Sequence, residues 1–214
     1  MGRPNAQPVA ISLPDLVVRA QAQGPGRVLL GICGAPGAGK STLAENLVKT
    51  LGDESVYVGM DGFHLAQVEL ERLNRTARKG APDTFDAAGY VNLLTRLKNQ
   101  TETTVYAPEF RREIEEPIAG AVPIHPEHRI VVTEGNYLLL STGPWREIKH
   151  LLTETWFLAP DETVRQERLL ARHQAFGRTL EEARERTLGS DERNAVMINA
   201  TCSSADLVIS EILD

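Results

Sequence analysis

The chain has 214 residues, a net charge of -6 at neutral pH and two cysteines. This length suits one well-buried domain, and the acidic balance argues against a nucleic-acid-binding protein, which usually presents a basic face. Two cysteines cannot build a disulfide framework or a four-cysteine zinc site. No stretch reaches the roughly 18 apolar residues of a membrane span, and the first seven residues hold no apolar signal-peptide core. We therefore expect a cytoplasmic protein without membrane insertion.

Short apolar or β-branched runs predict strands, and segments with helical periodicity separate them. The expected strands are residues 27–33, 55–58, 103–106, 129–133, 155–158 and 205–209. The expected helices are residues 13–23, 41–51, 65–73, 87–97, 145–152, 161–173 and 180–199, with Ser12 and Asp161 as N-caps. Residues 107–128 are rich in Pro, Glu and Arg and predict a loop with a hairpin. This alternation predicts a three-layer α/β/α fold around a mostly parallel sheet, which we expect to have five strands.

A glycine-rich loop lies between the strand 27–33 and the helix 41–51. Its pattern, G-x-x-x-x-G-K-S, is typical of a P-loop, in which backbone N–H groups and the positive end of the following helix hold phosphates. In such a loop Lys40 reaches the β- and γ-phosphates, and the Ser41 hydroxyl ligates Mg²⁺. The loop predicts binding of ATP and Mg²⁺ by Gly34, Ala35, Pro36, Gly37, Ala38, Gly39, Lys40, Ser41 and Thr42.

Two carboxylates follow predicted strands and indicate which reaction the bound triphosphate undergoes. The chain lacks the Asn-Lys-x-Asp motif of GTPases and the Leu-Ser-Gly-Gly signature of transporter ATPases, which leaves small-molecule kinases. Asp61 follows the second strand, where a kinase needs a base for the acceptor hydroxyl, although Asp-Gly is also a common turn pair. Glu134 follows strand 129–133, from which it can reach Mg²⁺.

Four segments together resemble the uridine kinase, phosphoribulokinase and type I pantothenate kinase superfamily, over about residues 28–209. They are the P-loop, Met60-Asp61-Gly62-Phe63-His64, Arg78-Lys79-Gly80-Ala81-Pro82-Asp83-Thr84-Phe85-Asp86 and Thr133-Glu134-Gly135-Asn136-Tyr137-Leu138-Leu139-Leu140. The nearest branch is a group of small bacterial nucleoside/nucleotide kinase family proteins labelled fructose transport system kinase. The resemblance implies that Asp61 is the catalytic base and that Glu134 helps to hold Mg²⁺.

The resemblance also implies one P-loop kinase domain over residues 1–214, with an arginine-bearing lid at about residues 165–185. Arg165, Arg168 and Arg172 follow helical spacing, so they share one face of the predicted helix, where they could equally pair with nearby acids. An arginine that faces the γ-phosphate stabilises the charge that develops during transfer. Arg172 and Arg178 flank Gly177, so we expect these two, with Lys40, to serve catalysis beside Asp61.

Residues near the predicted strand ends and in the two long loops are candidates for the acceptor pocket. They are Phe63, His64, Arg78, Asp83, Phe85, Arg111, Arg112, Asn136 and Tyr137. Arg111 and Arg112 could bind an anion on the substrate or offset nearby glutamates. Uridine kinases carry a different pair of residues after the base aspartate, and pantothenate kinases share an Asp-Gly-Phe stretch but are longer, so neither substrate transfers directly.

We expect an ATP- and Mg²⁺-dependent kinase that phosphorylates a hydroxyl of a small metabolite, with a sugar such as fructose as the first candidate. A nucleoside or a pantothenate-like acid is the alternative acceptor. A regulatory P-loop ATPase without an acceptor would have no need of Asp61, and an inactive binding module would not need Lys40, Ser41, Asp61 and Glu134 together. The partner is then the phosphate acceptor rather than a nucleic acid, and a homodimer is left open.

Overall fold

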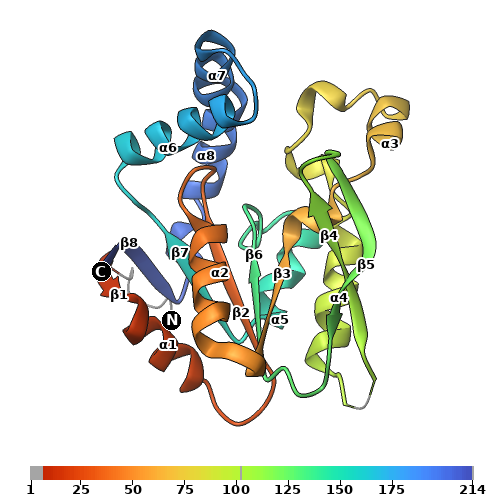
Figure 1. Cartoon of the computed structure of the whole chain (residues 1–214), viewed down its shortest axis with the longest axis vertical. Helices are drawn as coiled ribbons and strands as arrows, with labels where there is room; N and C mark the ends of the chain where they lie inside the picture. Colours follow the sequence, from red (N-terminus) through yellow and green to blue (C-terminus); the bar gives the residue numbers. More distant parts are fainter. Residues whose placement is uncertain (1–6, 102, 214) are drawn as a thin grey trace.

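A six-stranded parallel sheet forms the centre of the computed structural model, which describes residues 7–101 and 103–213 (Figure 1). Its strand order is β1-β8-β7-β2-β6-β3. The strands are β1 (Val9–Ser12), β2 (Val28–Gly34), β3 (Ser55–Gly59), β6 (Ile130–Glu134), β7 (Glu154–Leu158) and β8 (Leu207–Leu213). The α/β fold is confirmed, but the expected five strands were wrong. The sequence pattern missed β1, a four-residue edge strand that is half exposed and shows no clear alternation.

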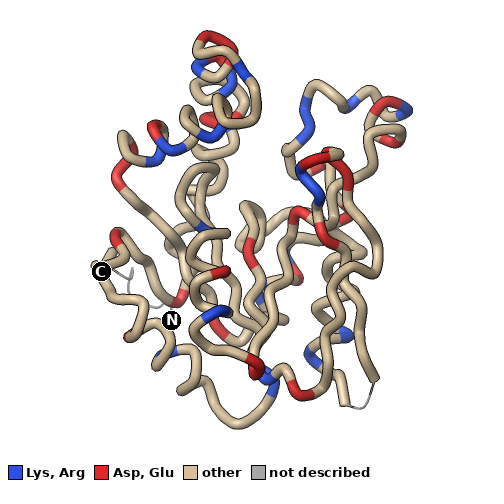
Figure 2. Tube along the Cα trace, in the orientation of Figure 1, with Lys and Arg blue, Asp and Glu red and all other residues tan. Residues whose placement is uncertain are grey.

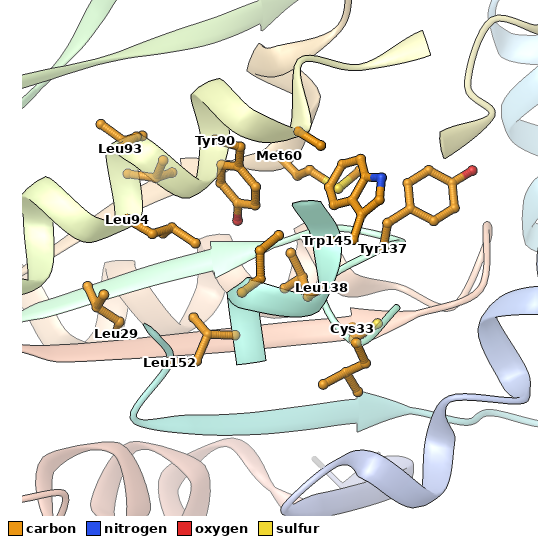
Figure 3. Packing of buried hydrophobic residues seen from close by; sticks show 14 of the residues in the cluster. Leu29, Cys33, Met60, Tyr90, Leu93, Leu94, Tyr137, Leu138, Trp145 and Leu152 are labelled. Carbon is orange, nitrogen blue, oxygen red and sulfur yellow. The ribbon is translucent and has the colours of Figure 1, made fainter. Parts of the chain in front are cut away.

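Helices cover both faces of this sheet and give the three layers. They are α1 (Leu13–Gln21), α2 (Lys40–Leu51), α3 (Gln67–Arg72), α4 (Ala87–Lys98), α5 (Ile148–Leu151), α6 (Glu162–Ala175), α7 (Leu180–Arg186) and α8 (Glu192–Asn199). All of β2 is buried, as parallel strands covered on both faces are. Leu30 and Ile32 of β2 pack in the core with α1 and α2, whereas Leu29 and Cys33 pack in the core with α4 and α5 (Figure 3).

The end of the predicted strand 103–106 and most of the segment 107–128, where a loop with a hairpin was expected, form an antiparallel hairpin apart from the main sheet. It consists of β4 (Val105–Arg111) and β5 (Glu116–Ile124). Val105, Ala107 and Ile124 bury their side chains in the core beside α4, which fixes the hairpin to the domain. The prolines and charged residues that made the segment look like a loop lie on strands of a two-stranded ribbon, where unpaired edges tolerate proline.

The carboxyl ends of the strands lie between two projecting parts. Helices α6, α7 and α8 rise on one side, and α3 with the tip of β4–β5 rises on the other (Figure 1). The predicted helix 180–199 is divided by a π-helical turn, Thr187–Asp191. Among the described residues, every helix falls short of the length and apolar character that a membrane span requires. Residues 1–6, on which the expectation of no signal peptide rests, lie outside the described residues.

The central strand supplies a direct test of the packing. Leu30 is fully buried between the two flanking strands, so we expect Leu30→Ala to lower the free energy of unfolding by about 2–5 kcal/mol through lost burial and a residual cavity. Urea denaturation measures the change. Val18→Ala on α1, at a side chain that is 65% exposed, should shift stability by no more than about 0.5 kcal/mol. Equal stabilities of the two variants would contradict this packing.

Candidate active site

The P-loop connects the end of β2 to the start of α2 in a conformation that requires glycine. Gly37 and Gly39 adopt φ values of 84° and 95°, which are in the left-handed region. A Cβ atom on Gly37 would lie 2.6 Å from the carbonyl oxygen of Arg165 on α6, so the loop and the lid helix touch through backbone. No side chain caps the N-terminus of α2 within the described part of the chain. Its N–H groups are thus free to hold an anion.

Glu134, at the end of β6, has oxygen-bearing neighbours from two other elements. Its Oε1 accepts a hydrogen bond from the Ser41 hydroxyl at 3.3 Å and one from the Tyr57 hydroxyl at 2.8 Å. Burial raises the pKa of the Glu134 carboxyl, and Lys40 opposes this shift. Burial likewise lowers the pKa of the Lys40 ammonium, against the effect of Glu134. Glu134 and Lys40 thus favour each other's charged form, but burial is the larger effect on the pKa of both groups.

This donor set fits a Mg²⁺ ion. Mg²⁺ prefers oxygen ligands and is often held by one or two protein groups together with substrate phosphates and water. Ser41 and Glu134 supply such oxygens beside the phosphate-binding loop. Within residues 7–101 and 103–213 no group of three or more His, Cys, Asp or Glu side chains forms a fuller metal cage. The protein would accordingly supply only part of the coordination shell.

Asp61 lies in the 3₁₀ turn Met60–Phe63, directly after β3. Its side chain is 34% exposed, and its Oδ2 lies 3.4 Å from a guanidinium nitrogen of Arg112. The His64 ring donates a hydrogen bond from Nδ1 to the Asp61 carbonyl oxygen at 2.8 Å, since a carbonyl can only accept. This ring lies between Phe85 and Phe110, with centroid distances of 4.0 and 4.8 Å. The Asp61 backbone is thereby fixed while its carboxylate stays accessible.

A cavity of about 400 Å³ joins these groups to α6, α7 and the segment between them. Its lining includes eleven of the residues that the sequence analysis predicted for the site. They are Pro36, Lys40, Ser41, Asp61, His64, Phe85, Arg112, Glu134, Asn136, Arg172 and Arg178. They come from the P-loop, the ends of β3 and β6, the tip of β4–β5 and the lid segment. The parallel sheet gathers the strand ends, and the two projecting parts add the rest.

Five candidate substrate residues lie outside this cavity: Phe63, Arg78, Asp83, Arg111 and Tyr137. Tyr137 is fully buried in the core, where its ring meets Trp145 edge-on and its hydroxyl donates to the Gly80 carbonyl (Figure 3). Phe63 stacks against a core tyrosine of α4. Arg78 and Asp83 form an ion pair at 2.8 Å, and Arg111 pairs with a carboxylate on its own strand at 2.6 Å. Proximity to a strand end could not show which way these side chains point.

The cavity also contains residues that the sequence did not single out. They are Lys79, Gly80, Phe110, Glu115, Gly135, His173, Phe176, Arg186, Asp191 and Asn194. His173 of α6 lies 2.7 Å from Asp191, which the π-helical turn brings toward the site. The available signals were weak: π-helical turns often mark functional sites but have no sequence motif, and Phe176 is an aromatic residue beside the glycine at position 177.

A second cavity, of about 780 Å³, lies on the other side of the P-loop. It is lined by Gly39, Thr42 and Asn46 from the loop and α2, by Arg168 from α6, and by residues of β8. Ala38 also contributes to its wall. The P-loop therefore separates two hollows, one with acids and bases at the strand ends and one that is less charged.

Comparisons with known proteins identify the family of the chain. A profile described as "Phosphoribulokinase / Uridine kinase family" matches residues 29–214. A Schizosaccharomyces pombe protein named "Putative uridine kinase" is 36% identical over 197 residues, which are 87% of this chain and 84% of that protein.

Solved structures show the same relationship. The crystal structure of a "putative fructose transport system kinase" from Silicibacter sp. TM1040 superposes with a TM-score of 0.84 and 35% identity, covering 92% of this chain and 98% of that one. YFH7 from Saccharomyces cerevisiae superposes with a TM-score of 0.79 over 94% of this chain and 97% of that one, at 20% identity, and supports the fold alone.

The buried His64 ring gives the stability of the folded protein a pH dependence. Burial lowers its pKa below the ordinary 6.5, with Asp61 opposing, so the unfolded chain binds a proton more readily than the folded one. The contribution of neutral His64 to the free energy of unfolding is fully present above about pH 6.5, and it is lost as the pH falls through the folded-state pKa. We expect urea denaturation between pH 7.5 and 5 to show a steeper loss for the native chain than for His64→Gln. Parallel pH profiles would contradict this role of burial.

Proposed function

The chain belongs to the phosphoribulokinase/uridine kinase family, and we propose that it transfers the γ-phosphoryl group of ATP to a hydroxyl group of a small metabolite. The observation that carries this proposal is the shared cavity, in which Lys40, Ser41 and Glu134 adjoin Asp61. A phosphate-binding loop, oxygen ligands for a divalent cation and an accessible carboxylate are the parts that phosphoryl transfer requires.

ATP would span the two hollows that the P-loop separates. Its phosphates would lie on the backbone N–H groups of the loop and the uncapped start of α2. Its base and ribose would enter the larger cavity, where Thr42, Asn46 and Arg168 offer polar groups beside apolar residues. Lys40, which donates to the Ala35 carbonyl at 3.2 Å, would turn to the β- and γ-phosphates.

Ser41 and Glu134 would hold Mg²⁺ at the β- and γ-phosphates. When bound, the ion neutralises the charge on these phosphates. Tyr57 donates to Glu134 and orients its carboxylate toward Ser41, so β3 contributes to the same site. The role of Tyr57 would be positioning rather than ligation.

Asp61 would accept the proton of the acceptor hydroxyl as its oxygen forms a bond to the γ-phosphorus. The bond between that phosphorus and the bridging oxygen then breaks, ADP leaves, and the acceptor becomes a phosphate ester. Lys40, Arg172 and Arg178 would stabilise the negative charge on the transferred group, since all three line the cavity. Such preorganised charges usually supply a large part of the rate enhancement.

Residues 165–185 would act as a lid over the phosphates. Gly177 has a φ of 86° between α6 and α7, a conformation that glycine adopts without strain. Changes at this position would alter where Arg178 lies relative to Arg172. Closure by such a hinge would also exclude water from the transfer site.

The acceptor class has three candidates. Similarity to a protein named as a fructose transport system kinase favours a sugar, and similarity to one named as a uridine kinase favours a nucleoside. The Asp61-Gly62-Phe63 stretch, which resembles pantothenate kinases, favours a pantothenate-like acid. A regulatory ATPase without an acceptor is the alternative of another class. The presence of Asp61 in the same cavity as Lys40 favours a kinase, because nucleotide binding alone has no use for a carboxylate at that place.

Removal of the proposed base should separate binding from transfer. We expect Asp61→Asn to retain ATP affinity within about twofold and to lose phosphoryl transfer by about a hundredfold or more, since general-base catalysis supplies that range. Nucleotide binding by calorimetry and ADP release with a metabolite mixture measure the two effects. Asp53→Asn, at an exposed position before β3, should match the native chain. Full turnover by Asp61→Asn would rule out the assignment.

The metal ligands should be visible in the magnesium requirement. Glu134→Gln keeps the size of the side chain but removes its charge, so the Mg²⁺ concentration for half-maximal turnover should rise about tenfold or more. Excess EDTA should stop turnover by the native chain. Glu45→Gln, an exposed change on α2, should leave the requirement as it is. An unaltered Mg²⁺ dependence in Glu134→Gln would show that Glu134 is not a ligand.

A further inference from the structure

The main cavity holds more unpaired arginines than a single triphosphate requires. Arg172, Arg178 and Arg186 line it, and none has a carboxylate oxygen within 4.0 Å among the described residues. Arg112 lines it as well, from the tip of β4–β5. Basic residues that line the cavity thus come from both the lid segment and the hairpin tip, on a chain whose net charge is -6; Figure 2 shows where basic residues fall along the backbone. The P-loop N–H groups, Lys40 and the lid arginines already suffice for the phosphates of ATP.

Arg112 stands apart from the other arginines on this side of the molecule because its pairing is weak. Its one hydrogen bond to a protein group in the described structure is the 3.4 Å contact with Asp61, and both side chains are partly exposed. By contrast, Arg78 lies 2.8 Å from Asp83, and Arg111 lies 2.6 Å from its carboxylate partner. Exposed pairs contribute only about 0–1 kcal/mol, so the contact with Asp61 is easily exchanged for another.

The position of Arg112 is nevertheless well defined by aromatic rings. Its guanidinium carbon lies 5.9 Å from the ring centroid of Phe110 on β4 and 5.9 Å from that of Phe176 in the lid. The Lys79 ammonium lies 5.6 Å from the same Phe110 ring. Two cations therefore flank one aromatic side chain at the wall of the cavity, near His64 and Asp61 rather than at the P-loop.

Lys79 also holds the hairpin tip in place. Its ammonium donates to the Glu115 carbonyl oxygen at 2.8 Å and lies 3.5 Å from the carboxylate of the same residue. Glu115 has a φ of 54°, a left-handed conformation that is uncommon outside glycine. The Lys79 ammonium thus fixes the turn that carries Arg112. The Lys79 side chain is only 18% exposed.

From this arrangement we infer that the acceptor carries a carboxylate or phosphate group, which Arg112 and Lys79 bind at the wall formed by Phe110. The planar guanidinium offers paired N–H donors that match the oxygens of either group. The inference rests on the proposed kinase function and narrows its acceptor classes. A sugar phosphate or a hydroxy acid meets the requirement, whereas free fructose and uridine do not.

The same contact links acceptor binding to the proposed base. In the structure Arg112 occupies one carboxylate oxygen of Asp61, the group that must receive the proton. An anionic acceptor would draw the guanidinium to itself, which frees that oxygen as the hydroxyl arrives. A neutral acceptor would leave Arg112 on Asp61. Anionic and neutral acceptors would then differ in the rate of phosphoryl transfer as well as in their affinity for the site.

Fractionation of potential acceptors by charge tests the inference. A protein-free metabolite extract is passed over an anion exchanger at pH 7.5, and the bound and unbound fractions are each incubated with the full chain, Mg²⁺ and ATP labelled at the γ-phosphate. We expect labelled product from the bound fraction. Product from the unbound fraction alone would overturn the inference while the kinase function stands. ATP hydrolysis without labelled product in either fraction would overturn the kinase function, and the inference with it.

A phosphatase treatment distinguishes the two anions. If the acceptor carries a phosphate ester, alkaline phosphatase treatment of the bound fraction, followed by removal of the enzyme, should abolish the labelled product. If it carries a carboxylate, the product should persist. Either result agrees with an anionic acceptor, and the mass of the labelled product then identifies the compound.

Variants of the hairpin tip, assayed with the acceptor identified in this way, test whether Arg112 binds the anionic group. Arg112→Gln should raise the KM for the acceptor about tenfold or more and leave the KM for ATP within about twofold. Arg112→Lys should recover part of the loss. The matched control is Arg111→Gln, which removes the same charge from the neighbouring position, where Arg111 pairs with Glu109 outside the cavity. Equal acceptor KM values for Arg112→Gln and Arg111→Gln, or a larger effect of Arg112→Gln on ATP, would overturn the assignment.

Discussion

The register of the parallel strands is the constraint on which the rest of the site depends. Glu134, the last residue of β6, is paired with Ile32 on β2 and with Gly59, the last residue of β3, while β2 continues two residues further to Gly34. The P-loop begins where β2 ends at Gly34, and Asp61 lies in the turn that follows the end of β3. Because alternate residues of a strand face opposite sides, a slip of one residue would turn Glu134 away from Ser41.

A second constraint connects this sheet to the lid. Arg165 is 2% exposed, and its guanidinium donates to the Pro36 carbonyl oxygen in the P-loop at 2.8 Å while it pairs with Glu162 and Glu192. Breaking a buried pair by removal of one partner usually costs about 3–5 kcal/mol. The first turns of α6 are thus fixed to the phosphate-binding loop. Movement of the lid must therefore occur further along the chain, toward Gly177.

The sequence predicts a site residue well when neighbouring residues fix its position, and poorly when segments distant in the sequence must fold together to place it. The P-loop is local: its glycines are required by backbone conformation, so the motif alone located it. Glu134 and Asp61 follow buried strands and were found from strand ends. Lys79 and Phe110 were not among the candidate site residues, because they meet at the cavity only when the β4–β5 hairpin folds against the segment that follows α3. Asn136 lines the cavity whereas the side chain of its neighbour Tyr137 is buried in the core, and the sequence could not show which of the two residues faces the site.

Electrostatics suggests why the two sides of the cavity should act together. Burial lowers the pKa of Arg172, and the nearby positive charge of Arg112 adds to that effect, whereas Asp191, Asp61 and Glu134 oppose it. Arg112 already contacts Phe176 in the lid and Phe110 in the hairpin, and thereby bridges the two projecting parts. A ligand shifts a conformational equilibrium only through its different affinity for the two states. An anion placed between Arg112 and Arg172 supplies such a difference, because the attraction grows as the lid approaches the hairpin and as water leaves the site.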